Sequence, residues 1–166
     1  MSQRVLVVDD EAANRSALER ILAREGLSVL QAADARAALE LVRKEAPDLM
    51  LTDLKMPGMS GLDLMRAARA IDPALEVILM TAFGTVETAV EAMKDGAYDF
   101  VTKPLRRAEI VAAARKALEK RALVQENHAL RAVFDVQRKA LQLRLAAPPR
   151  NQRCIPRINL RLLEQC

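Results

Sequence analysis

Polar residues stand at the ends of four short apolar runs in this chain. Asp9 and Asp10 follow the run VLVV, Asp53 follows LMLT, Thr81 follows VILM and Lys103 follows AYDFVT, whereas a fifth run, SVLQAA, contributes no such residue. If the runs are parallel strands of one sheet, these residues meet at its carboxyl edge, where open α/β sheets bind ligands. Three carboxylates and one ammonium leave a local charge of about −2, which favours a divalent cation. The pattern therefore predicts a site that takes up and holds a phosphoryl group.

The cation expected at this edge is Mg²⁺. It prefers oxygen ligands and commonly combines one or two carboxylates with waters and substrate phosphate. We expect Asp10 and Asp53 to be direct ligands and Asp9 to act largely through water. The backbone carbonyl of Lys55 would complete the protein's share of the ligands.

Asp53 is the expected nucleophile, because a carboxylate can attack phosphorus to give an acyl phosphate. Such transfers depend mainly on positioning and charge neutralisation. Lys103 would pair with the remaining phosphoryl oxygens, and Thr81 offers a hydroxyl at the end of the neighbouring strand. Phosphorylation of Asp53 adds a charge of about −1.5 to −2, which can draw Thr81 and its loop inward, toward the phosphoryl group. Each of these residues alone is an ordinary cap or loop residue, so the prediction rests on their joint pattern.

The elements that must position these residues alternate along the first hundred positions. Strands are expected at 4–8, 28–32, 48–52, 76–80 and 98–102, and helices at 11–25, 34–45, 61–71 and 85–95. Nearly continuous apolar strands indicate a parallel sheet that is covered on both faces. Asp34 and Thr85 are the expected amino-terminal caps, and Gly26 and Gly96 the expected helix ends. The fold class is therefore α/β.

A different composition begins after Pro104. From Leu105 to about Leu145 there is neither Gly nor Pro, which predicts one long helix. A row of residues at 3-4 spacing, interrupted by Gln137, indicates an imperfect coiled-coil seam: Leu123, Asn127, Leu130, Phe134 and Leu141. A simple amphipathic linker helix is the alternative. We divide the chain into a domain at 1–121, a linker or coiled-coil helix at 122–146, and a basic, disordered tail at 147–166.

The charge of the chain is asymmetric. Residues 1–104 hold 12 Lys and Arg against 17 Asp and Glu, whereas residues 105–166 hold 14 against 5. A basic segment can attract nucleic acid, yet four aromatic residues offer no stacking platform, so nucleic-acid binding stays open. No apolar run reaches the ~20 residues of a membrane span, and no signal-peptide pattern begins the sequence. We therefore expect a cytoplasmic protein without membrane contact.

Four stretches resemble the receiver domain of two-component response regulators: VLVVDDE (5–11), DLMLTDLKMPGMSGLDLM (48–65), VILMTAFG (77–84) and GAYDFVTKP (96–104). The resemblance covers residues 4–120. It implies a flavodoxin-like, doubly wound sheet of five parallel strands in the order 2-1-3-4-5, followed by the long carboxyl-terminal helix. It also implies a tight turn at Gly61 and a cis bond between Lys103 and Pro104.

The resemblance assigns a role to each residue of the pattern. Asp53 is the phosphoacceptor, Lys103 the phosphate-binding lysine, Asp9 and Asp10 the metal pair, Thr81 the switch hydroxyl and Phe100 the switch aromatic. The phosphoryl donor would be a sensor histidine kinase. The response would change the face formed by helix 85–95, strand 98–102 and the following helix. That face and the linker helix would set the geometry of a homodimer.

The segment from Thr81 to Pro104 is similar to receivers of enhancer-binding activators of nitrogen-type sigma-factor RNA polymerase. Those activators continue into an ATPase domain and a DNA-binding helix-turn-helix. Residues 146–166 resemble neither one, and no GxxxxGK[ST] loop is present. The output of the switch therefore stays open.

Three alternative functions fit the sequence less well than a phosphoacceptor switch. An aspartate-nucleophile phosphohydrolase would need a D-x-D motif where this chain has Asp9-Asp10-Glu11. A dinucleotide-binding domain would need a glycine loop after the first strand. An interaction or DNA-binding module would use the basic helix alone. We expect a phosphoacceptor switch rather than an enzyme acting on an external substrate.

Overall fold

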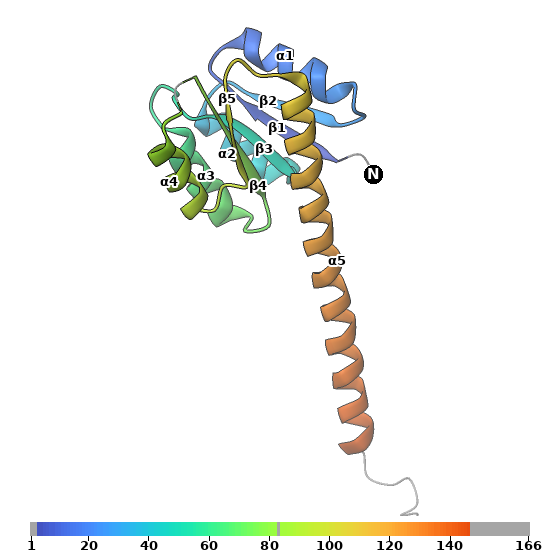
Figure 1. Cartoon of the computed structure of the whole chain (residues 1–166). Coiled ribbons are helices and arrows are strands. Elements are labelled where there is room, and N and C mark those ends of the chain that lie inside the picture. The colour runs from blue at the N-terminus through green and yellow to red at the C-terminus, as the bar shows by residue number, and fades with distance from the viewer. Residues whose placement is uncertain (1–2, 83, 147–166) are drawn as a thin grey trace, which may run out of the picture. The chain divides into compact units, whose positions relative to one another are not determined.

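The computed structural model describes residues 3–82 and 84–146, in which strands and helices alternate five times (Figure 1). The order is β1 (Arg4–Val8), α1 (Ala12–Ala23), β2 (Ser28–Ala32), α2 (Ala35–Glu45), β3 (Leu49–Asp53), α3 (Gly61–Ile71), β4 (Glu76–Thr81), α4 (Val86–Lys94), β5 (Asp99–Thr102) and α5 (Arg107–Ala146). All ten expected elements are present, and their boundaries differ from the expected ones by at most two residues.

The five strands form one parallel sheet in the order β2-β1-β3-β4-β5. Both the α/β class and the predicted strand order are confirmed. The chain leaves β1 for the edge position β2 and returns to β3 on the other side of β1. Ligands bind at such a reversal, at the carboxyl ends of the strands.

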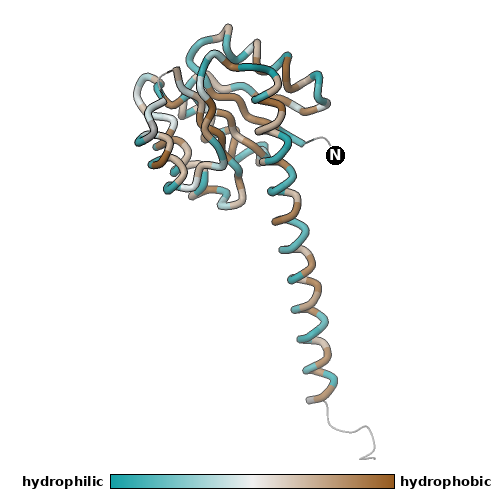
Figure 2. The backbone as a smooth tube through the Cα atoms, in the orientation of Figure 1, coloured by the Kyte–Doolittle hydropathy of each residue, from teal (hydrophilic) through white to brown (hydrophobic). Residues whose placement is uncertain are grey.

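Side chains that alternate along each strand build two separate cores. Val5 and Val7 of β1 point to one face, where α1 and α5 cover the sheet, and Leu6 and Val8 point to the face covered by α2, α3 and α4. The inner strands β3 and β4 are buried along their whole length. The hydropathy colouring of Figure 2 accordingly runs brown along the strands. This two-sided burial is why the strands appear in the sequence as continuous apolar runs.

The expected helix caps are confirmed. The side chains of Asp34 and Thr85 accept hydrogen bonds from the amides of Ala37, at 2.8 Å, and Thr88, at 3.2 Å. Gly26 and Gly96 have left-handed φ angles of 80° and 98°, which a side chain would strain. Short turns thus return the chain from the helices to the sheet.

Helix α5 is one helix from Arg107 to Ala146, as predicted. Its first turns bury Ile110, Ala114 and Leu118 in the core shared with α1. By its internal contacts the chain divides into Met1–Asn127 and His128–Cys166, and the domain boundaries expected from the sequence remain predictions. The expected disordered tail, 147–166, lies outside the described residues. None of the described helices is long and apolar enough to cross a membrane.

Ion pairs tie α5 to the amino-terminal edge of the sheet. The guanidinium of Arg121 donates to Asp48 Oδ1 at 3.1 Å and to Asp72 Oδ2 at 2.9 Å, and its side chain is only 7% exposed. Lys120 Nζ lies 2.9 Å from Glu76 Oε1 at the start of β4. The loops before β3 and β4 are therefore held by the same turn of α5.

Candidate functional site

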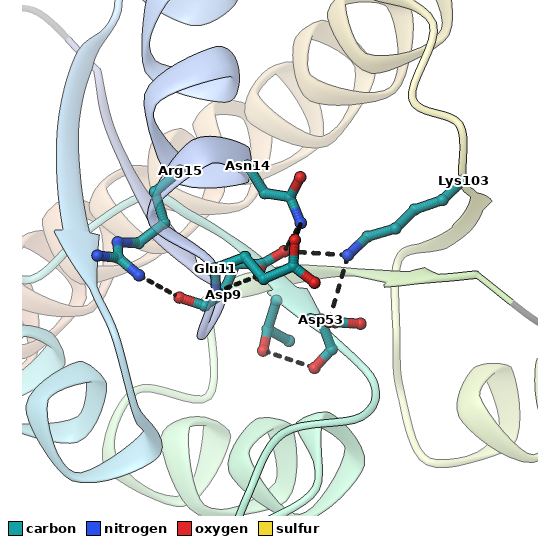
Figure 3. A network of polar contacts seen from close by, with 7 residues as sticks. Asp9, Glu11, Asn14, Arg15, Asp53 and Lys103 are labelled. Carbon is teal, nitrogen blue, oxygen red and sulfur yellow. Dashed lines mark hydrogen bonds and ion pairs between the residues drawn. The ribbon is translucent and has the colours of Figure 1, made fainter.

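Three strands bring charged side chains together at the carboxyl edge of the sheet (Figure 3). Lys103, just after β5, reaches across so that its Nζ lies 3.1 Å from Asp9 Oδ2 and 3.2 Å from Asp53 Oδ2. The Asp9 side chain is fully buried, and those of Asp53 and Lys103 are 12% and 19% exposed. The predicted convergence of Asp9, Asp53 and Lys103 is therefore present in the structure.

The first turn of α1 fixes the carboxylate of Asp9. The amide of Glu11 donates to its Oδ1 at 2.9 Å, and the Asn14 side chain donates to its Oδ2 at 3.2 Å. The Arg15 guanidinium donates to the Asp9 carbonyl at 2.6 Å. Neither Asn14 nor Arg15 was predicted from the sequence. Their place in the first turn of the helix that follows the acidic pair is the signal that would have identified them.

The end of β3 is packed too tightly for any side chain at Gly61. A Cβ added there would lie 2.2 Å from the Asp53 carbonyl oxygen, and the Gly61 amide donates to the Leu54 carbonyl at 2.8 Å. The resemblance implied a tight turn at Gly61. Gly61 begins α3, and the close approach of the Asp53 backbone, rather than a left-handed φ, excludes a side chain at this position.

The acidic residues form a group that fits a hard cation. One carboxylate oxygen each from Asp9, Asp10 and Asp53 lie within 4.8 Å of one another. All three are oxygen donors, as Mg²⁺ prefers, and Asp10 is exposed whereas Asp9 is buried. Lys55, two residues past Asp53, lies on the exposed loop that follows β3.

Lys103 carries its charge firmly at this site. Partial burial on its own lowers the pKa of a lysine, but the hydrogen bond and charge of Asp9, followed by those of Asp53, outweigh it. The pKa of Lys103 is therefore raised above its ordinary value. A lysine that stays charged at neutral pH suits the binding of an anionic group beside two carboxylates.

The two remaining predicted residues lie on neighbouring strands. Thr81, at the end of β4, is 2% exposed, and its carbonyl accepts the Lys103 amide at 2.7 Å. Phe100 of β5 is half-buried against the core under α2, α3 and α4. A Cβ added at Gly84 would lie 2.7 Å from Phe100 Cε1, so Gly84 makes room for the ring. The Lys103-Pro104 bond is cis, as the resemblance implied.

Comparison with known proteins agrees with this geometry. The family model described as the response regulator receiver domain matches residues 5–115. The C4-dicarboxylate transport transcriptional regulatory protein DctD of Rhizobium meliloti (strain 1021) is 40% identical over 139 residues, which are 84% of this chain and 30% of that protein. Sporulation initiation phosphotransferase F of Bacillus subtilis (strain 168) is 38% identical over 118 residues, 71% of this chain and 95% of that protein.

A solved structure extends the comparison. The solution structure of the beryllofluoride-activated NtrC4 receiver domain dimer is 34% identical, with a TM-score of 0.68 over 71% of this chain and 98% of that one. The chain spans less than a third of the length of the DctD and ZraR regulators that it matches. These matches do not favour the phosphohydrolase, dinucleotide-binding and DNA-binding alternatives. The chain belongs to the family of response regulator receiver domains, which act in two-component signal transduction.

Proposed function

We propose that Asp53 is the phosphoacceptor of this receiver. An Asp53 carboxylate oxygen attacks the phosphorus of a phosphohistidine on a partner sensor histidine kinase. The new P–O bond gives an aspartyl phosphate, the P–N bond breaks, and its electron pair stays on the imidazole nitrogen, which takes up a proton. The observation that carries the proposal is the contact of one lysine with two strand-end carboxylates, Asp9 and Asp53, at 3.1 and 3.2 Å.

The acidic group fits Mg²⁺, and we assign Asp9, Asp10, Asp53 and the Lys55 carbonyl as the residues that would hold it. When bound, the ion supplies neutralisation of the charge that the carboxylates and the phosphoryl oxygens bring together. Lys103 already lies against the Asp53 oxygen and would pair with the phosphoryl group once it is attached. Asn14 keeps Asp9 oriented during this exchange of partners.

The switch proposed here runs from Asp53 to the face formed by α4, β5 and α5. The phosphoryl group draws the Thr81 hydroxyl toward it, and Phe100 moves into the space that Thr81 leaves. Two large apolar side chains on α4, Val90 and Met93, are 46% and 49% exposed and suit a protein contact. We propose that this face, together with the linker helix, forms a homodimer whose geometry depends on the state of Asp53.

Water later hydrolyses the aspartyl phosphate, which regenerates the Asp53 carboxylate and releases inorganic phosphate, so the domain transfers phosphate only to itself and is no enzyme for an external substrate. The protein acts in the cytoplasm, where a histidine kinase obtains its phosphate from ATP. Nucleic-acid binding is not part of the proposal, because residues 3–82 and 84–146 form only the receiver fold and α5.

The direct test is labelling by acetyl phosphate with and without Mg²⁺, followed by intact-mass measurement and mapping of the acyl phosphate. We expect one phosphoryl group per chain with Mg²⁺, none after chelation, and none in Asp53→Asn. Asp135→Asn, an exposed carboxylate on α5, is the matched control and should label normally. Equal labelling of Asp53→Asn and the wild-type protein would remove the assignment.

Lys103→Ala separates phosphate uptake from switching. The nucleophile and the acidic group remain, so we expect slow but measurable labelling of this variant. Without the lysine that joins the ends of β1 and β3 to the phosphate, we expect no change of oligomeric state on labelling. A normal response by sedimentation velocity would show that Lys103 has no part in the switch.

A further inference from the structure

Helix α5 carries two rows of exposed, mostly apolar residues beyond Arg121. The first row repeats at 3-4 spacing and consists of Leu123, Asn127, Leu130, Phe134, Gln137 and Leu141, with the leucines and the phenylalanine 51–66% exposed. The second row also repeats at 3-4 spacing and consists of Ala129, Val133, Val136, Ala140 and Leu143. At 3.6 residues per turn the two rows lie on different faces of the helix. The way in which the chain associates depends on which of the two rows another molecule covers.

Charged neighbours favour the first row. In a parallel, in-register pair of helices, the residue that precedes one core position lies near the residue five positions later on the other helix. For the first row these two residues are Glu126 and Arg131. They have opposite charge, both are exposed, and within residues 3–82 and 84–146 neither forms an ion pair inside its own chain. Two such pairs would form across the two-fold axis.

The charges that flank the second row disfavour a parallel pair. The corresponding flanking residues are Lys139 and Arg144, which are both cations. A parallel pair of helices on this row would place like charges side by side, which is destabilising. The second row therefore fits a second copy less well than the first row, although it lacks any polar core residue.

The polar residues in the first row bear on orientation. In a parallel pair, Asn127 faces Asn127 of the second copy, and a single buried asparagine of this kind fixes register. An antiparallel pair would instead place Asn127 opposite Gln137 and Glu126 beside the uncharged Ala140, so the pair between Glu126 and Arg131 would not form. Only the parallel pair keeps the amino-terminal ends of both helices together, as a shared dimer face of α4, β5 and α5 requires.

We propose that the first row of α5 pairs with the same row of a second copy, parallel and in register, and that Glu126 pairs with Arg131 of the second copy on both sides of the seam. This proposal rests on the homodimer proposed above and specifies its surface, its orientation and its ion pairs. It does not depend on the identity of the phosphoacceptor.

The test is a charge-reversal cycle on the full chain, measured by sedimentation equilibrium at low ionic strength without phosphate. Glu126→Arg and Arg131→Glu each turn two attractive pairs into two repulsive ones, and we expect each to raise the dimer Kd at least roughly tenfold. The double variant Glu126→Arg/Arg131→Glu restores both pairs and should return the Kd to within about threefold of wild type.

Matched controls distinguish the effect of the first row on the dimer Kd from the effect of net charge. Lys139→Glu and Asp135→Arg make the same charge changes away from the first row and should leave the Kd within about threefold. Leu130→Gln should weaken the dimer, whereas Val136→Gln, in the second row, should not. All variants should accept phosphate from acetyl phosphate like the wild type, so a failure of this proposal is distinct from a failure at Asp53.

Several outcomes would overturn the proposal. A double variant Glu126→Arg/Arg131→Glu that dimerises as weakly as either single variant would exclude the parallel, in-register pair. A stronger loss with Val136→Gln than with Leu130→Gln would move the interface to the second row. The proposed interface would be excluded if the wild-type chain stayed monomeric at high micromolar concentration. It would also be excluded if the control variants weakened the dimer as much as the charge reversals do.

Discussion

Arg121→Ala is the sharpest test of how α5 is attached to the sheet. The wild-type guanidinium donates to Asp48 and Asp72, which precede β3 and β4. Truncation leaves both carboxylates without this partner and removes the buried stem of the arginine. Asp48 keeps the amide of Arg4, at 2.9 Å, and Asp72 keeps the amide of Ala74, at 3.0 Å. The expected result is a large loss of stability without a change at the phosphoryl site.

The magnitude follows from burial. Removing one partner of a buried ion pair typically costs about 3–5 kcal/mol, because the other charge is left without compensation. Two features place the expected loss of stability at the lower end of this range. The Asp48 and Asp72 side chains are 24% and 25% exposed, so water can reach them, and Nη1 of Arg121 is buried without a hydrogen bond, which already costs the wild type. We therefore expect a loss of about 3 kcal/mol in the free energy of unfolding.

Urea unfolding followed by far-ultraviolet circular dichroism measures this loss. With a slope of about 1–3 kcal/mol per molar urea, the midpoint should fall by roughly 1–3 M. Arg36→Ala, which removes an exposed pair with Glu40, is the control and should change stability by less than ~0.5 kcal/mol. Arg121→Met, which keeps much of the volume, should resemble Arg121→Ala if the charge pairing dominates. A loss below ~1 kcal/mol for Arg121→Ala would refute the reasoning.

Three other predictions concern the site. Because the folded pKa of Lys103 is raised, the stability from its pairing is complete below the unfolded value of about 10.4 and is lost as the pH rises through the folded value; the difference in unfolding free energy between wild type and Lys103→Met should shrink above that pH, and a constant difference would contradict it. Gly61→Ala places a Cβ 2.2 Å from the Asp53 carbonyl oxygen, so both the urea midpoint and the labelling rate of Asp53 should fall; unchanged values for both would contradict the close approach. Gly84→Ala should displace the Phe100 ring, since the added Cβ would lie 2.7 Å from it, and the ring proton shifts in NMR spectra should move; identical shifts would show that the ring does not rest on residue 84.

Much of the fold followed from the sequence because its signals are local. Buried parallel strands must be apolar on both faces, so their runs and polar ends were visible, and the parallel topology then placed Asp9, Asp53 and Lys103 at one edge. The contacts that were not predicted depend on tertiary placement. Asn14 and Arg121 look like ordinary polar residues of amphipathic helices, and only the packing of α1 and α5 on the sheet gives them their partners.

The outer strand β5 limits how this sheet can associate with a further strand. Strand β5 is an edge of only four residues, begins with Asp99, and is followed directly by the lysine and the proline of the site. A short edge with charged and proline neighbours is a poor template for a further strand. Extension of the sheet beyond β5 is therefore disfavoured, and a partner on this side would contact the side chains of α4, β5 and α5 rather than add a strand.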